Sequence, residues 1–217
     1  MSRTVTHSLL VPLTAQTGKE NDVANFLINA HSIILNWPNI HQWYATRLTS
    51  TSPTQFLVLG TYPNDEARSA YLTGPLPKSL GENAPEILVG MPIHSEILSE
   101  IVAHNITKAG EGLKSGLSTG LKVSFKAKSG RADAVKKFLV EVALPLIKAE
   151  TDTISWYALH WPGTEKFVIV DFFASDEARE AHLAGPVAAA LIASIDENFT
   201  GFPDIARLDI LAAKVEL

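Results

Sequence analysis

The side chains best suited to acid–base chemistry are a histidine and an aspartate in the second half of the chain. His182 lies in a short predicted helix just before Gly185 and Pro186, and an imidazole there could act as a general base or bind a phenol. Asp171 lies in the apolar run FVIVDFF, where an unpartnered carboxylate would cost several kcal/mol to bury. We therefore predict a catalytic pair in which Asp171 orients His182.

Both residues also have a structural interpretation. A histidine in the last turn of a helix is favoured there as a cation, and Asp171 could instead bind backbone groups or an arginine. Glu150, in the segment KAETDT, is interpreted as a turn carboxylate. Because Tyr71 stands at the position that matches His182 in an earlier, similar segment, we expect loss of the imidazole to cost only about 1 kcal/mol of stability.

Aromatic residues upstream of this pair could form the walls of a binding site. Trp156 and Tyr157 are adjacent, so they point to opposite faces of a strand, and His160 shares the face of Trp156. Earlier in the chain, Trp43 stands at the position that matches Trp156, and Tyr71 stands at the position that matches His182. We predict that these five residues bind substrate, although the recurrence of Trp-Tyr in both copies favours core packing for Trp43, Trp156 and Tyr157.

The positions match because the chain contains two similar segments. FLVLGTYPNDEARSAYLTGP from Phe56 and FVIVDFFASDEAREAHLAGP from Phe167 are identical at nine of twenty positions. Trp-Tyr-Ala recurs at Trp43 and Trp156, and the offset between matching residues stays between 111 and 113. We interpret the chain as a tandem duplication, and below we call residues at this offset counterparts.

Each copy has the same predicted order of elements, β-α-β-β-α-β, which is a ferredoxin-like unit of the α+β class. We predict a first copy over residues 1–104, a linker over 105–117 and a second copy over 118–217. Each sheet has a second apolar face that must be covered, so we expect the copies to form a pseudo-dimeric α/β barrel. Whether two chains then form a homodimer is left open.

The copies are not expected to be equivalent. The first has Gly60 and Tyr71 where the second has Asp171 and His182. We therefore regard the first copy as degenerate and the second as the candidate active unit. We expect the second to hold the deeper and more polar cavity.

Composition excludes several other classes of protein. The net charge is −5 with scattered basic residues, which does not suggest binding to nucleic acid or to a membrane surface. There are no cysteines, and the histidines lack the spacing of metal ligands, so we expect no metal. The sequence also lacks a Rossmann or P-loop glycine pattern, and we expect no other cofactor. Without an apolar run long enough to span a membrane, or a signal sequence, a cytoplasmic protein is expected.

The second copy resembles the antibiotic-biosynthesis-monooxygenase-like group of the dimeric α/β-barrel superfamily. The resemblance lies in ALPLIKAETDTISWYAL, FVIVDFFASDEAREAHLAGPVAAAL and IARLDILAAK, and it is weaker in the first copy. It implies a cofactor-independent monooxygenase that acts on a small aromatic or enolisable hydrophobic molecule, for example in secondary metabolism. The alternatives are a non-catalytic hydrophobic-ligand-binding or stress-related protein, and a non-oxidative decarboxylase or cyclase.

Overall fold

The computed structural model describes residues 4–217, which form two compact units. Unit 1 contains the described residues up to Ser99 together with Ala109–Gly116 and Asp209–Leu217, and unit 2 contains Glu100–Lys108 and Leu117–Leu208. The units therefore differ from the two sequence copies, because the end of each copy belongs to the other unit.

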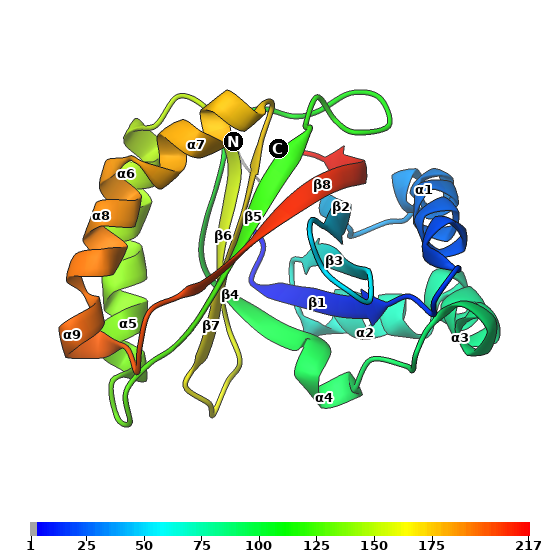
Figure 1. Ribbon diagram of the computed structural model, residues 1–217, viewed down its shortest axis with the longest axis horizontal. Helices are drawn as coiled ribbons and strands as arrows, with labels where there is room; N and C mark the ends of the chain where they lie inside the picture. The colour runs from blue at the N-terminus through cyan, green and yellow to red at the C-terminus, as the bar shows by residue number, and fades with distance from the viewer. Residues whose placement is uncertain (1–3) are drawn as a thin grey trace. The chain divides into compact units, whose positions relative to one another are not determined.

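Unit 1 has three antiparallel strands with helices against one face (Figure 1). β3 lies between β1 and β2, with Leu9 and Trp43 both opposite Gly60. Asn64 caps α2 by accepting a hydrogen bond from the backbone N–H of Ala67 at 2.9 Å. The elements are β1 (His7–Thr14), α1 (Glu20–Leu35), β2 (Gln42–Leu48), β3 (Gln55–Tyr62), α2 (Asp65–Leu72), α3 (Pro75–Ile87) and α4 (His94–Ile97).

Unit 2 repeats this order. β7 lies between β5 and β6, and Leu121 and Trp156 both stand opposite Asp171. Ser175 caps α7 by accepting from the N–H of Ala178. The elements are β5 (Thr119–Lys126), α5 (Ala132–Phe138), the π-helical turn η1 (Leu139–Ala143), α6 (Leu144–Ala149), β6 (Thr153–His160), β7 (Lys166–Phe173), α7 (Asp176–Leu183), α8 (Pro186–Ala193) and α9 (Ile195–Asn198).

Two longer strands complete the sheet. β4 (Leu98–Ile106) ends the first sequence copy but pairs with β6 of unit 2, with Glu100 opposite His160. β8 (Asp204–Val215) contributes its last residues to unit 1. Hydrogen-bonded neighbours follow the closed order β1-β3-β2-β8-β5-β7-β6-β4, which confirms the predicted pseudo-dimeric barrel of two ferredoxin-like units.

Each unit has its own apolar core between sheet and helices. Trp43 packs with Val23 and Leu27 of α1 in unit 1, and Trp156 packs with Val135 and Leu139 in unit 2. The sequence left open which aromatic residue faces the helices, and the structure assigns the tryptophans to that face. None of the helices within residues 4–217 combines the length and the apolar character needed to cross a membrane.

Candidate functional site

Three ionisable side chains meet in unit 2, each from a different element. Glu150 follows the end of α6, Asp171 lies in the middle of β7, and His182 lies in the last turn of α7. His182 Nδ1 is 2.8 Å from Glu150 Oε2, and His182 Nε2 is 3.2 Å from Asp171 Oδ2. We call these three residues the triad.

Neighbouring groups hold the triad in place. The hydroxyl of Thr153 donates a hydrogen bond of 2.6 Å to Glu150 Oε2. The ring of Phe173 packs against the imidazole, with centroids 5.3 Å apart. Asp171 is fully buried, whereas 16% of the Glu150 side chain is exposed, so only the Glu150 end of the triad reaches solvent.

The triad shifts the pKa of each of its members. Burial alone would lower the pKa of His182, but Asp171 and Glu150 outweigh it and raise that pKa to about 10. Burial raises the pKa of Asp171, and His182 opposes this shift. Burial also acts to raise the pKa of Glu150, but the bonds from His182 and Thr153 lower it overall. His182 is therefore an imidazolium at neutral pH, with Nδ1 donating a hydrogen bond to Glu150 and Nε2 forming an ion pair with Asp171.

This geometry bears directly on the predicted catalytic pair. The structure brings His182 and Asp171 together, as the sequence predicted, and adds Glu150, which the sequence suggested only as a turn carboxylate. An imidazolium has no lone pair with which to accept a proton from a substrate. General-base catalysis by His182 stays a prediction, and it would require the imidazole first to leave one of its two carboxylates.

The space beside the triad is small. A depression of about 220 Å³ in unit 2 is lined by Glu150, His182 and mostly small neighbours such as Ala178, Ala181 and Gly185. A drug-sized ligand needs roughly 300 Å³ or more.

The other residues predicted to bind substrate in unit 2 lie apart from this depression. Trp156 is fully buried in the core, and Tyr157, on the opposite face of β6, stacks on His104 with centroids 6.3 Å apart. His160 ends β6, with Nε2 2.9 Å from the carbonyl oxygen of Thr164 and its ring against Phe167. The structure does not bring these three residues together with the triad around one cavity.

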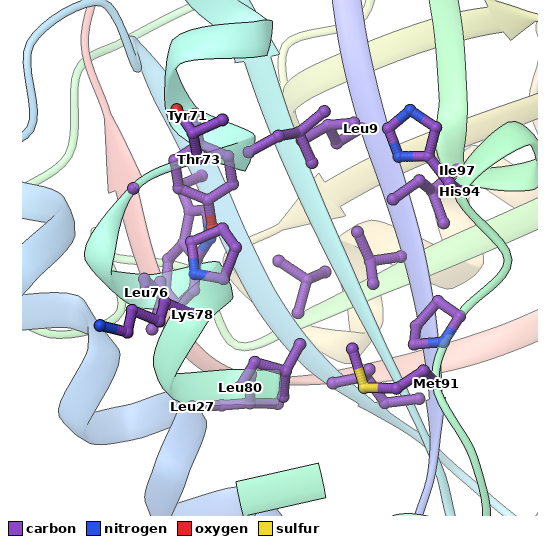
Figure 2. Close-up of a pocket in the computed structure, with 18 of the residues that line it drawn as sticks. Leu9, Leu27, Tyr71, Thr73, Leu76, Lys78, Leu80, Met91, His94 and Ile97 are labelled. Carbon is purple, nitrogen blue, oxygen red and sulfur yellow. The ribbon is translucent and has the colours of Figure 1, made fainter. Parts of the chain in front are cut away.

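A large and mainly apolar cavity lies in unit 1. It has a volume of about 520 Å³ and lies between the sheet and helices α1 and α3 (Figure 2). We call it the Tyr71 pocket. Its lining residues are mainly apolar and include two residues predicted from the sequence, Trp43 and Tyr71. The prediction that the second copy holds the deeper cavity is therefore wrong, whereas the small depression of unit 2 does have the more polar lining, with Glu150, Asp152 and His182.

Polar groups are few in the Tyr71 pocket. In Figure 2, Tyr71 and Thr73 lie on the side opposite His94 and Ile97, and the ammonium of Lys78 points away from the cavity. Burial raises the pKa of Tyr71 well above its usual range, with Trp43 opposing the shift in part. The phenol is thus a neutral hydroxyl at any physiological pH.

Aromatic side chains in unit 1 replace the charges of the triad. Tyr71 is the counterpart of His182, and it packs edge-on against Trp37, the counterpart of Glu150, with centroids 5.9 Å apart. Tyr62, the counterpart of Phe173, lies 5.6 Å from Tyr71 between ring centroids. The two units thus use equivalent positions for an ionic network in one case and for an aromatic cluster in the other.

Within residues 4–217, no three His, Asp or Glu side chains are grouped so that they could hold a metal ion.

Comparisons with solved structures give the family context. A proposed monooxygenase from Fusobacterium nucleatum superposes with a TM-score of 0.80 at 12% identity, covering 99% of this chain and 96% of that one. An anthrone oxidase-like protein gives 0.60 at 14% identity, covering 96% and 92%. A Listeria monocytogenes ferredoxin-fold protein, described as related to antibiotic biosynthesis monooxygenases, gives 0.52 at 10% identity and covers 96% of both chains.

The chain has the fold of the antibiotic-biosynthesis-monooxygenase-like proteins. The resemblance noted in the sequence is thereby confirmed, and the likeness covers nearly the whole chain rather than the second copy alone. At these low identities the monooxygenase-like fold is established, and the reaction has to be argued from the site. No protein-family model matches the chain, and no curated protein matches it either.

Proposed function

We propose that this chain is a monooxygenase-like enzyme that uses no resident cofactor. Its substrate, a small aromatic or enolisable hydrophobic molecule, would bind in the Tyr71 pocket of unit 1. The observation that carries the proposal is the cavity itself, whose volume of about 520 Å³ lies within the usual range for small-molecule sites. By this criterion the depression beside the triad is too small.

The chemistry of the walls supports an apolar, flat ligand. Seven leucine and valine side chains from β1, α1, β3 and α3 line the pocket, with Phe26, Trp43 and Tyr71 as aromatic surfaces. The neutral hydroxyl of Tyr71 is suited to donate a hydrogen bond to a carbonyl oxygen. With the Lys78 ammonium directed away in Figure 2, the pocket favours an uncharged molecule over a carboxylate.

The reaction proposed is oxidation of an activated methylene by O₂. A base removes a proton from the carbon, and the resulting carbanion supplies electrons to O₂. One oxygen atom ends in the new carbonyl group and the other in water, so that R₂CH₂ and O₂ give R₂C=O and H₂O. His94 is the imidazole that lines the pocket, and it forms no hydrogen bond or ion pair with the described residues, so it is our candidate base.

Anthrone is a suitable probe, because it is flat, uncharged and enolisable, and because one structural neighbour is named anthrone oxidase-like. With purified protein in the presence of a chelator, we expect oxygen uptake equal to anthrone consumed, with anthraquinone as product. Anthrone binding without oxygen uptake would favour the alternative, a non-catalytic hydrophobic-ligand-binding protein.

A pair of exposed positions provides a matched control. Thr73 lies at the rim of the pocket, and its counterpart Ala184 is also exposed but lines no described cavity. Thr73→Trp should obstruct the pocket and lower oxygen uptake at least tenfold, while Ala184→Trp should leave it unchanged. Equal rates in both variants, or uptake that depends only on His182, would count against the pocket as the site.

A further inference from the structure

We propose that Leu13 is a specificity-determining residue. By being a leucine rather than a phenylalanine, it decides that the cavity forms in unit 1 and not in unit 2. This inference deepens the proposed function, since the cavity concerned is the proposed substrate site.

Strand pairing shows that Leu13 and Phe125 occupy the same place in the two units. Leu13 of β1 stands opposite Phe56 of β3, and Phe125 of β5 stands opposite Phe167 of β7. Directly after the end of each first strand, an alanine forms an isolated bridge, Ala15 with Leu88 and Ala127 with Phe199. The equivalence therefore rests on backbone register as well as on sequence.

In unit 2, aromatic rings fill this region. The ring of Phe125 lies 4.7 Å from that of Phe199, and it lies 5.7 Å from that of Phe167 and nearly parallel to it. All three side chains are buried. In unit 1 the same three positions hold Leu13, Leu88 and Phe56, so one ring remains where unit 2 has three.

Several other side chains along the pocket wall are smaller in unit 2 than in unit 1, which would enlarge a cavity in unit 2 rather than fill it. Along the pocket wall, Tyr71 and Leu76 have smaller counterparts in His182 and Val187. Leu9, Val11 and Trp43 have identical counterparts. Exchanges at the helices would thus make the cavity of unit 2 larger, and yet among the described cavities the large apolar one lies in unit 1.

Among the lining residues of β1, β2, β3 and α3, only two have a larger counterpart. Leu13 is replaced by Phe125, and Val58 by Ile169, which adds a single methylene. Leu88 also has a larger counterpart, but it does not line the pocket. Met91, beyond α3, also lines the pocket and has a larger counterpart, Phe202, but that side chain is 83% exposed and does not fill unit 2. The exchange of Leu13 for a ring is therefore the largest change at a buried lining position.

The reciprocal substitutions test this inference. Leu13→Phe should fold, because the equivalent backbone in unit 2 carries phenylalanine, and it should weaken anthrone binding at least tenfold by calorimetry. Leu13→Ile keeps the side-chain volume and should bind like the wild type. Phe125→Leu should open an apolar cavity in unit 2.

Xenon provides a readout that does not depend on the proposed substrate, because dry apolar cavities bind it. In crystals under xenon pressure, we expect a xenon atom in the Tyr71 pocket of the wild type. It should be lost in Leu13→Phe, and Phe125→Leu should gain one between β5 and α8. If folded Leu13→Phe keeps both xenon and anthrone, the inference is overturned. If Leu13→Phe does not fold, the result for Phe125→Leu alone decides: no new xenon site would contradict the inference.

The two proposals fail separately. If the wild-type protein takes up xenon but neither binds nor oxidises anthrone, the proposed function is contradicted, while the role of Leu13 in forming the cavity stands.

Discussion

The phenol oxygen of Tyr62 lies 2.8 Å from the point that a Cβ atom on Gly60 would occupy. Their counterparts in unit 2 are Asp171 and Phe173, where the carboxylate is present and the ring carries no hydroxyl. The space beside the central strand therefore holds one polar group in each unit, the hydroxyl of Tyr62 beside β3 and the carboxylate of Asp171 beside β7. The two positions should be energetically coupled.

Gly60→Asp should destabilise the protein by about 3 kcal/mol, because it overpacks the site and buries a carboxylate without a partner. Adding Tyr62→Phe removes the steric conflict and should recover about 1 kcal/mol or more. Urea unfolding of the two single variants and the double variant gives the coupling energy. Strictly additive effects would show that the two positions do not share this space.

His182→Ala should destabilise the protein by about 3–5 kcal/mol, because it leaves Asp171 as an unpaired buried charge. This is more than the approximately 1 kcal/mol expected from the sequence, since the sequence did not reveal that two carboxylates depend on this imidazole. The control is His182→Ala combined with Asp171→Asn, which removes the charge and should be less destabilising than the single variant. Thermal and urea unfolding measure both, and an equal or larger loss in the double variant would contradict the ion-pair account.

The triad should also make stability depend on pH. The pKa of His182 is raised to about 10, above an unfolded value of about 6.5, so its contribution is complete below about pH 6.5 and is lost as pH rises toward 10. The pKa of Asp171 is also raised, so this group likewise makes the free energy of unfolding fall as pH rises. The pKa of Glu150 is lowered, so Glu150 adds stability that is lost in acid.

We therefore expect the free energy of unfolding to fall from neutral pH to about pH 10 more steeply in the wild type than in His182→Gln. Other groups titrate in this range, so the difference between the two proteins is the measured quantity. A His182 imidazole that NMR shows to be deprotonated at pH 8 would refute the assignment.

Much of the fold could be predicted from the sequence because it depends on local patterns. The strand and helix order follows hydrophobic periodicity, and Asn64 and Ser175 are typical helix caps. The meeting of His182 with Asp171 also followed, since a buried carboxylate requires a partner. Glu150 was missed as a partner because its approach depends on where α6 ends, which no residue type in KAETDT specifies.

The location of the cavity could not be predicted from residue chemistry. His182 and Asp171 drew attention to the second copy, but buried ionisable residues can neutralise each other and leave no room for a ligand. Whether a cavity exists depends on the sum of side-chain volumes, such as Leu13 against Phe125, and that becomes readable only when register and neighbours are known.

The measurement that tests the central claim most directly is a crystal structure of the wild-type protein with bound anthrone. We predict density for a single anthrone in the Tyr71 pocket of unit 1, against Trp43 and Tyr71, with the triad of unit 2 unchanged. Anthrone bound beside His182 with the Tyr71 pocket empty would contradict the account and return the site to the second unit.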